Sequence, residues 1–330
     1  MYHLRKAIVR SFSCRPLLVT GYPLRHAPGM KCRAVALCVG WCAGAPLVTS
    51  VSAAEPLAKG IQDNSFLVEE AYNQEPGVVQ HIFNLPLLFT GHEKDISPSF
   101  TQEWPIFTQT HQFSYTLPYT FARNGGWENG LSDIRLNYRF QALMEAERMP
   151  AFAPRFSFVV PTGDAGKGFG HDRLGYEVNL PFSKIVSDRW TIHFNAGGSL
   201  FPAVKGHDLW NYNLGASAIY AISETFNLML ETVAGWNDDV DLAAIAGSAK
   251  AAPARKVDRT TTALISPGTR YAFNLPGDLQ IVAGAAVPIG LTSDSPDWGL
   301  FFYLSFEHPF VRTSAKNNEQ RFFAAPVIDF

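Results

Sequence analysis

The most constraining feature of this sequence is a strict alternation of apolar and polar residues over unusually long segments. In one such segment, apolar residues share one parity and polar residues the other: Phe113, Tyr115, Leu117, Tyr119 and Phe121 against Gln112, Ser114, Thr116 and Thr120. A period of two residues places these sets on opposite faces of a β-strand. The segments have about 10 to 14 residues, enough for a tilted strand to cross a bilayer, whereas globular strands have about 5 to 6.

The same pattern recurs along residues 78–310 of the chain. The polar residues of each segment share one face of the strand, which in a membrane barrel faces the water-filled lumen. The apolar residues share the other face, which contacts lipid. We predict that the polar face carries the residues that line a transport route. They are Arg135, Asn137, Arg139, Arg155, Glu177, Asn179, His193, Asn195 and Glu231.

The connections between these segments alternate between long and short. Long, polar connections are expected near residues 90–97, 123–131, 163–172, 200–208, 237–257 and 291–297, and short turns near 107–110, 144–151, 184–188, 223–225 and 274–278. Six long loops and five short turns give about twelve strands, with both termini on the short-turn side. A soluble two-sheet sandwich also alternates, but strand length, aromatic residues near strand ends and loop asymmetry favour a membrane barrel. The sequence therefore predicts an all-β, transmembrane antiparallel β-barrel over residues 78–310, with both termini periplasmic.

Composition excludes several other classes of protein. Aromatic residues make up 13% of the chain, and beyond its N-terminal region no run of about 18 apolar residues predicts a membrane-spanning helix. Residues 55–330 contain 20 Lys and Arg against 29 Asp and Glu. Because this part of the chain is acidic, it predicts no nucleic-acid partner.

The N-terminal region predicts an export signal. From Met30 onward, Lys31 and Arg33 precede an apolar run, 34–51, and small residues follow at 51–54. We therefore interpret residues 30–54 as a signal peptide and residues 1–29 as an upstream extension from a mis-assigned start codon. A mitochondrial presequence is the alternative. The predicted location is the bacterial outer membrane.

Residues 55–77 form an acidic segment between the predicted signal and the first strand. Two alternatives are open for it. It enters the lumen as a plug, with Glu69, Glu70 and Glu75 facing the arginines of the wall, or it stays in the periplasm.

Three stretches resemble a family of bacterial outer-membrane β-barrel proteins, labelled MetA-pathway-of-phenol-degradation or "transporter". They are residues 64–81 with 100–104, residues 154–164 that include Val160-Pro-Thr-Gly-Asp164, and Asn195-Ala-Gly-Gly198. The resemblance spans about residues 61–310. It implies passage of small, often hydrophobic compounds across the outer membrane.

The end of the predicted barrel carries an alternating aromatic pattern. Phe306 and Phe310 share the parity of Phe302, and this resembles the terminal signal that barrel-assembly machinery recognises. We therefore predict an assembly signal at Phe306 and Phe310, followed by a periplasmic tail over residues 311–330. The predicted partners are this machinery, outer-membrane lipid and lipopolysaccharide, and a small-molecule solute.

The motifs of common enzymes are missing from the sequence. It contains no Gly-x-Ser-x-Gly and no His-Glu-x-x-His, and all four cysteines precede residue 55. We therefore predict no catalytic residue, metal or cofactor, and a channel or transporter as the function. The alternatives are an outer-membrane enzyme acting on lipid or lipopolysaccharide, in which His193 would pair with Glu177 or Glu231, and a structural barrel with partner-binding loops.

Overall fold

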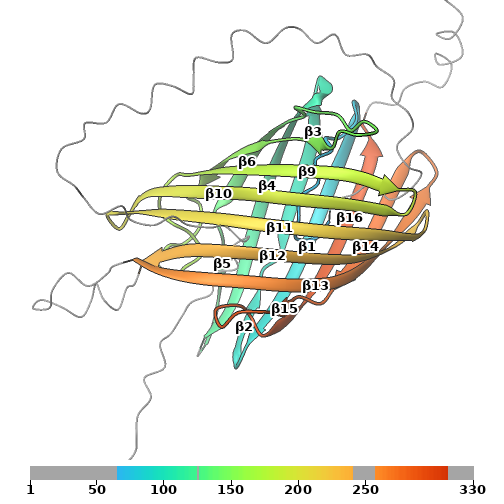
Figure 1. Ribbon diagram of the computed structural model, residues 1–330. Coiled ribbons are helices and arrows are strands. Elements are labelled where there is room, and N and C mark those ends of the chain that lie inside the picture. The colour runs from blue at the N-terminus through green and yellow to red at the C-terminus, as the bar shows by residue number, and fades with distance from the viewer. Residues whose placement is uncertain (1–64, 125, 241–256, 311–330) are drawn as a thin grey trace, which may run out of the picture.

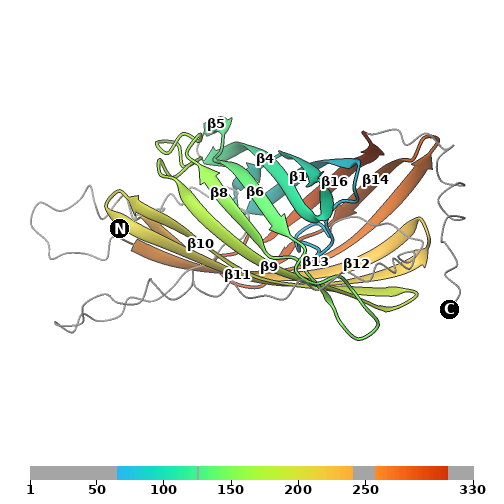
Figure 2. The ribbon, with the colours of Figure 1, turned by 90° about the horizontal axis from the view of Figure 1, so that it is seen from above.

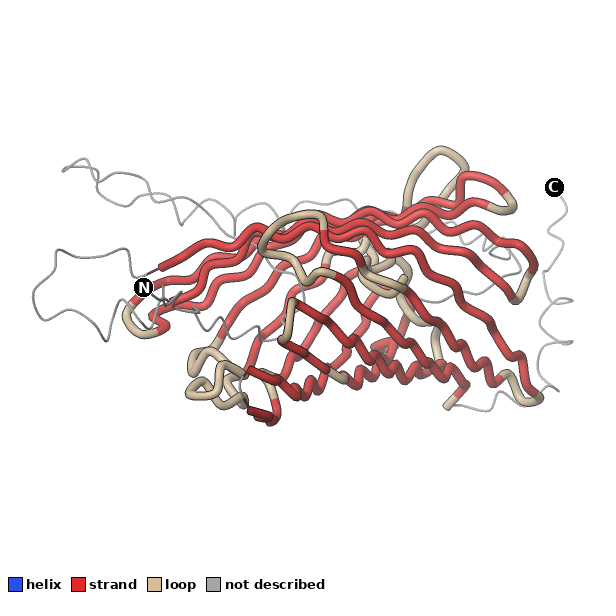
Figure 3. The backbone as a smooth tube through the Cα atoms, turned by 90° about the horizontal axis from the view of Figure 1, so that it is seen from below, coloured by secondary structure: helices blue, strands red, loops and turns tan. Residues whose placement is uncertain are grey.

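The computed structural model describes residues 65–124, 126–240 and 257–310. Within these ranges the protein consists of β-strands joined by loops and turns (Figure 3). No helix among the described residues is long and apolar enough to cross a membrane. The expectations for residues 1–54 and 311–330 lie outside the described ranges.

Sixteen strand segments follow one another along the chain (Figure 1). They are β1 (Val78–Thr90), β2 (Glu93–Ile96), β3 (Ser99–Ile106), β4 (Thr108–Asn124), β5 (Gly126–Leu131), β6 (Ile134–Phe140), β7 (Ala151–Phe152), β8 (Arg155–Val160), β9 (Gly175–Ser187), β10 (Trp190–Val204), β11 (His207–Ser223), β12 (Phe226–Val240), β13 (Val257–Leu275), β14 (Leu279–Ala286), β15 (Ile289–Gly290) and β16 (Trp298–Pro309).

These segments make a closed antiparallel barrel of twelve strands. β2 and β3 both pair with β1 and β4, so they form one interrupted strand, and the pairs β5/β6, β7/β8 and β14/β15 do the same. The first and last strands close the barrel, with Val78 opposite Pro309 and Phe89 opposite Trp298. Closure leaves no sheet edge to face lipid, which backbone hydrogen bonding requires in a bilayer. The predicted fold class and strand number are confirmed.

Proline accounts for most of the interruptions. Pro98, Pro154 and Pro288 lie in three of the four gaps, and each lacks the N–H that a strand ladder needs. Their carbonyls still accept hydrogen bonds from neighbouring strands, as in Tyr119 N to Pro98 O at 2.8 Å. The strand path therefore continues through each gap.

The two ends of the barrel differ from each other. We call the end with Val78 and Pro309 the terminal rim and the opposite end the far rim. At the far rim, three of the expected long connections are mostly strand, because β1 and β2 cover most of 90–97, β4 and β5 most of 123–131, and β10 and β11 most of 200–208. The β10–β11 turn has positive φ at Lys205 and Gly206, typical of the tight turns that match strand twist. The hairpins here are longer than the alternation alone indicated.

The strands form two walls that cross at a large angle (Figures 1 and 2). The long strands β9 to β13 make one wall, and β1, β3, β4, β14 and β16 contribute to the other. Large apolar side chains are exposed on the outside of both, including Trp127, Trp210 and Trp298 near the far rim and Trp190 near the terminal rim. Such aromatic residues at both ends of an apolar band are typical of membrane barrels.

Candidate functional site in the lumen

Residues 65–74, which we call the lumenal segment, lie inside the barrel between the two walls (Figure 2). The segment begins near the middle of the wall, where Ser65 Oγ lies 2.8 Å from Ser217 Oγ, and reaches the terminal rim at Gln74. It has no regular secondary structure. Its backbone groups therefore need other partners.

Side chains of the wall accept hydrogen bonds from the backbone of the lumenal segment. Five amino acids on five different strands or loops supply these oxygens, so the segment is fixed along its whole length. The bonds run from Leu67 N and Val68 N to Glu231 Oε1 (2.9 and 3.1 Å), Glu69 N to Asn195 Oδ1 (2.8 Å), Ala71 N to Ser183 Oγ (2.7 Å), Asn73 N to Gln141 Oε1 (3.0 Å) and Gln74 N to Gln112 Oε1 (2.7 Å).

Arg139 binds the carbonyl side of the same segment. Its guanidinium donates to Glu70 O at 3.2 Å, Tyr72 O at 2.7 Å and Asn73 Oδ1 at 2.8 Å. The residue is 2% exposed. A planar guanidinium offers five donors in a fixed fork, so one side chain can satisfy several backbone acceptors of an irregular segment.

A network of ion pairs joins the lumenal segment to one side of the lumen. Glu69 Oε2 lies 2.9 Å from Arg155 Nε, and Glu69 Oε1 lies 3.2 Å from Arg139 Nη1. Arg155 also reaches Glu177 at 2.6 Å, and Glu177 lies 3.4 Å from Arg135. With Glu103, 3.7 Å from Arg139, the network holds three arginines and three glutamates. Opposite charges are therefore matched within it, as burial in a barrel interior requires.

The opposite side of the lumen holds a cluster of apolar side chains. Phe66 of the lumenal segment stacks on Phe301 and Tyr303, with ring centroids 5.5 and 5.2 Å apart. Further buried apolar residues surround these rings: Ile82, Ile219, Met229, Ala272, Val282 and Ala286. We call Phe66 and these eight residues the apolar cluster. Hence the lumen has the ion-pair network on one side and the apolar cluster on the other, with Glu231 and Arg270 buried on two strands of that cluster. The lumenal segment contacts both sides.

Glycine makes room for Phe66. A Cβ atom at Gly284 would lie 2.3 Å from Phe66 Cζ, and one at Gly268 would lie 3.2 Å from Phe66 Cε2. Any side chain at Gly284 must therefore displace the Phe66 ring. The position of the lumenal segment thus depends on a missing side chain in β14.

One further contact fixes the lumenal segment at the terminal rim, and a second holds its partner, Glu145, against the wall. The Tyr72 hydroxyl donates to Glu145, which lies in the loop between β6 and β7. Lys184 Nζ lies 2.8 Å from the other oxygen of Glu145. This loop, which the sequence predicted merely as a turn, therefore closes over the end of the lumenal segment.

The loop over residues 161–174 folds onto the wall at the far rim. Asp133 accepts hydrogen bonds from Gly163 N at 3.0 Å, His171 N at 2.9 Å and His171 Nδ1 at 2.8 Å. The His171 ring stacks on Phe201 with centroids 3.6 Å apart. One carboxylate therefore fixes both ends of the loop.

His193 does not have the carboxylate partner that the hypothesis of an acid–base pair requires. Its Nδ1 lies 2.7 Å from Ser183 Oγ rather than beside Glu177 or Glu231. Ser183 Oγ accepts from Ala71 N, so the lumenal segment covers the serine. The described contacts of His193 include no carboxylate. This Ser–His pair is thus a buried structural contact, without the third group or open access of a catalytic triad.

The structure places the predicted lumenal residues on the inner wall. All but two of the nine are buried, and the two, Arg135 and Arg155, are partly exposed within the ion-pair network. Glu69 joins that network, and Glu70 is buried with its carbonyl bound to Arg139. Glu75 departs from the expectation, because it is exposed at a turn outside the lumen, where its carbonyl accepts from Val78 N.

The two residues of the predicted assembly signal lie at the terminal rim. Phe306 is on the outer face of β16, 6.2 Å from the Phe83 ring. Phe310 follows the end of β16 at Pro309, one residue earlier than expected, and its N donates to Gly77 O at 2.8 Å. Its side chain is exposed.

The described residues hold no group of three or more His, Cys, Asp or Glu side chains that could bind a metal ion. The charged side chains of the lumen instead bind one another and the lumenal segment. The arrangement can therefore hold a segment of chain against both the polar and the apolar side chains of the lumen.

Comparison with solved structures identifies the fold. The COG4313 outer membrane channel from Pseudomonas putida F1 matches with a TM-score of 0.53 and 12% sequence identity, over 72% of this chain and 97% of that chain. The NanC porin matches with a TM-score of 0.42 and 7% identity, over 69% of this chain and 98% of that one. The β domain of the Bordetella autotransporter BrkA matches with a TM-score of 0.40 and 9% identity, over 72% and 100%.

Sequence comparisons found no match, either to a family model or to a curated protein. At 12% identity, the likeness to the Pseudomonas channel concerns the fold alone. Together with the apolar outer band and the closed even-stranded sheet, it identifies the chain as a bacterial outer-membrane β-barrel.

Proposed function

We propose that this protein is an outer-membrane channel for small molecules that are apolar on one side and polar on the other. The observation that carries the proposal is the division of the lumen into the ion-pair network and the apolar cluster. A solute with both kinds of surface finds a partner on each side. The predicted wall residues on β6, β8 and β9 then line its polar side.

In this proposal, the lumenal segment is a displaceable plug. It belongs to no strand ladder, and its bonds to the wall come from side chains. Each such hydrogen bond contributes about 0.5 to 1.5 kcal/mol net. Movement of the segment would therefore leave the hydrogen-bonded wall intact, whereas movement of a strand would open the barrel.

A liposome experiment tests the proposal. Purified full-length protein in liposomes should admit an aromatic alcohol or a similar amphipathic solute faster than a sugar of similar size. Empty liposomes set the background rate. Equal, background-level entry of both solutes would contradict a transport function and would favour a structural barrel.

A further inference from the structure

A row of five side chains crosses the outer surface near the far rim. Trp298, Phe89, Lys94, Arg123 and Trp127 lie directly opposite one another on successive strands, from β16 through β1, β2 and β4 to β5. Lys94 and Arg123 are exposed, whereas Asp95, the next residue after Lys94, is buried on the inner side. The row therefore faces the membrane rather than the lumen.

Two like charges are neighbours in this row. Lys94 and Arg123 are cross-strand partners, and like charges in this position destabilise an antiparallel pair. Neither residue has an ion pair with an acidic side chain among residues 65–124, 126–240 and 257–310. Lys94 Nζ lies 6.0 Å from the centre of the Phe89 ring, so its chain lies along the wall. An anion bound between the two cations would replace their repulsion with attraction.

The flanking aromatic residues indicate the depth of this pair. Tryptophan side chains of membrane proteins gather at the headgroup level of the bilayer. Trp127 and Trp298 stand at the two ends of the row and are 54% and 47% exposed. The two cations therefore lie at the level of lipid phosphates.

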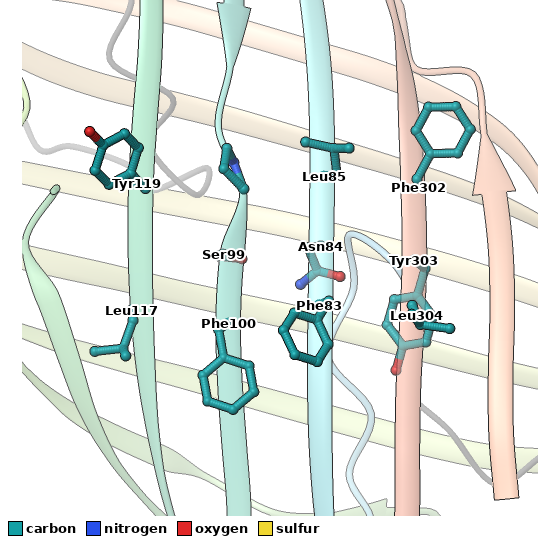
Figure 4. A pocket seen from close by; sticks show the side chains of 11 residues that line it. Phe83, Asn84, Leu85, Ser99, Phe100, Leu117, Tyr119, Phe302, Tyr303 and Leu304 are labelled. Carbon is teal, nitrogen blue, oxygen red and sulfur yellow. The ribbon is translucent and has the colours of Figure 1, made fainter. Parts of the chain in front are cut away.

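An apolar groove lies on the same strands, closer to the middle of the wall. It has a volume of about 430 Å³. Figure 4 shows its lining from β1, β3, β4 and β16, which includes Phe83, Leu85, Phe100, Leu117, Tyr119, Phe302 and Leu304. A single row with Leu87, Ile96 and Phe121 separates the groove from the cations.

The distance from the cations to the Phe100 end of the groove matches one membrane leaflet. From Lys94 to Phe100 the strand path covers six residues, about 20 Å at roughly 3.3 Å per residue. A tilt of about 40° reduces this to a depth of about 15 Å, half of a hydrocarbon core of about 30 Å. A lipid with its phosphate at Lys94 can therefore lay an acyl chain in the groove.

We propose that this surface binds one phosphate-bearing lipid of the leaflet at the far rim. The phosphate lies between Lys94 and Arg123, and an acyl chain fills the groove lined by Phe83, Phe100 and Leu117. The site is on the outside of the barrel, separate from the lumenal segment. It is therefore independent of transport through the lumen.

Native mass spectrometry of the full chain in detergent tests this site. The probes are dioleoyl phosphatidic acid and dioleoylglycerol, which has the same acyl chains without the phosphate. We expect the protein to retain one phosphatidic acid in preference to dioleoylglycerol. Lys94→Gln with Arg123→Gln should weaken retention about thirtyfold, since each cation near a membrane surface contributes about fivefold. Leu117→Trp, which narrows the groove, should weaken it while keeping both cations.

A matched control uses two other exposed cations at the far rim, Arg173→Gln with Lys205→Gln. These changes remove the same charge and should leave retention unchanged. Equal loss in both double variants, or equal retention of both probes by the unaltered protein, would overturn the proposal. Displacement of the lipid by millimolar inorganic phosphate would likewise overturn it, in favour of a site for free anions.

Two further arms keep the test decisive. Bisphosphorylated lipid A replaces phosphatidic acid in one arm, and preferred retention of either lipid supports the site. Every variant is first checked for heat-resistant mobility on gels. If the double variant does not fold, Lys94→Gln and Arg123→Gln are measured singly, and retention unchanged in both would overturn the proposal.

Discussion

Glu69 of the lumenal segment lies 2.9 Å from Arg155 of β8, and this ion pair joins the segment to the wall of the barrel. A second arginine, Arg139, lies 3.2 Å from the same carboxylate. Asn179 donates to it as well, at 2.6 Å. The carboxylate is therefore the main charged anchor of the segment.

Replacement of this anchor should open the channel. Glu69→Gln removes a carboxylate that Arg139 and Arg155 share. It should destabilise the plugged state by about 2 kcal/mol relative to the open state. This is below the roughly 3–5 kcal/mol typical of fully buried pairs, because 19% of the Glu69 side chain is exposed. The open fraction in planar-bilayer recordings should rise about thirtyfold. Glu75→Gln, at the exposed turn, is the control, and unchanged current in Glu69→Gln would contradict a plug.

A methyl group in β14 should displace the plug from the apolar side. Gly284→Ala places a Cβ atom 2.3 Å from Phe66 Cζ and should destabilise the folded barrel by about 1 to 3 kcal/mol through overpacking. The temperature at which the protein loses its heat-resistant mobility should fall. Gly126→Ala, with nothing within 4 Å of its Cβ, should leave it unchanged. In the background of Phe66→Ala, Gly284→Ala should no longer lower this temperature. If the double variant instead loses the sum of the two single losses, the contact between residue 284 and Phe66 is contradicted.

Opposite faces of β6 should respond differently to a negative charge. Arg135 lies in the lumenal network, 3.4 Å from Glu177, so Arg135→Glu should change ion selectivity while the barrel still assembles. Tyr138 is 42% exposed on the outer face, so Tyr138→Glu should hinder assembly by placing a charge in lipid. Reversal potentials and heat-resistant mobility measure the two effects. Exchanged phenotypes would show that the lumenal face has been assigned to the wrong parity.

The terminal aromatic signal can be tested by mutation. Phe310→Ser should reduce the yield of assembled barrel, because the residue ends the alternating aromatic pattern of β16. Deletion of residues 311–330 should leave that yield unchanged. Pulse-labelled cells analysed on unheated gels give the yield. Normal assembly of Phe310→Ser together with failure of the deletion would place the signal at Phe330 instead.

Much of the fold followed from residue parity. The alternation of Arg135, Asn137 and Arg139 with Leu136 and Tyr138 predicted a strand with one wet face, and the structure has this strand in β6. Twelve strands could be predicted because lipid on one side and water on the other act on every second residue. The position of each turn at the far rim could not be predicted, since hairpins such as β4–β5 continue the strand pairing through residues expected in a loop, up to Asn124 opposite Gly126.

The lumenal site was less accessible to sequence reasoning. The alternation of polar and apolar residues predicts a polar inner face. However, Ile82, Met229 and Phe301 lie on the inner face and pack around Phe66. Parity placed Gln141 and Ser183 on the polar face, but it did not predict that they bind the lumenal segment, because one amide or hydroxyl on that face carries no signal of its own. Their role depends on a segment that lies far from them in the chain.

The lumenal segment also has a consequence for assembly. Its hydrogen-bond partners are spread over β4, β9, β10 and β12, from Gln112 to Glu231, and they face one another once the wall has closed. Residues 65–74 precede all the described strands, so they are synthesised before any of these partners. The segment can therefore make its native hydrogen bonds only after the strands that carry its partners have been synthesised and brought together.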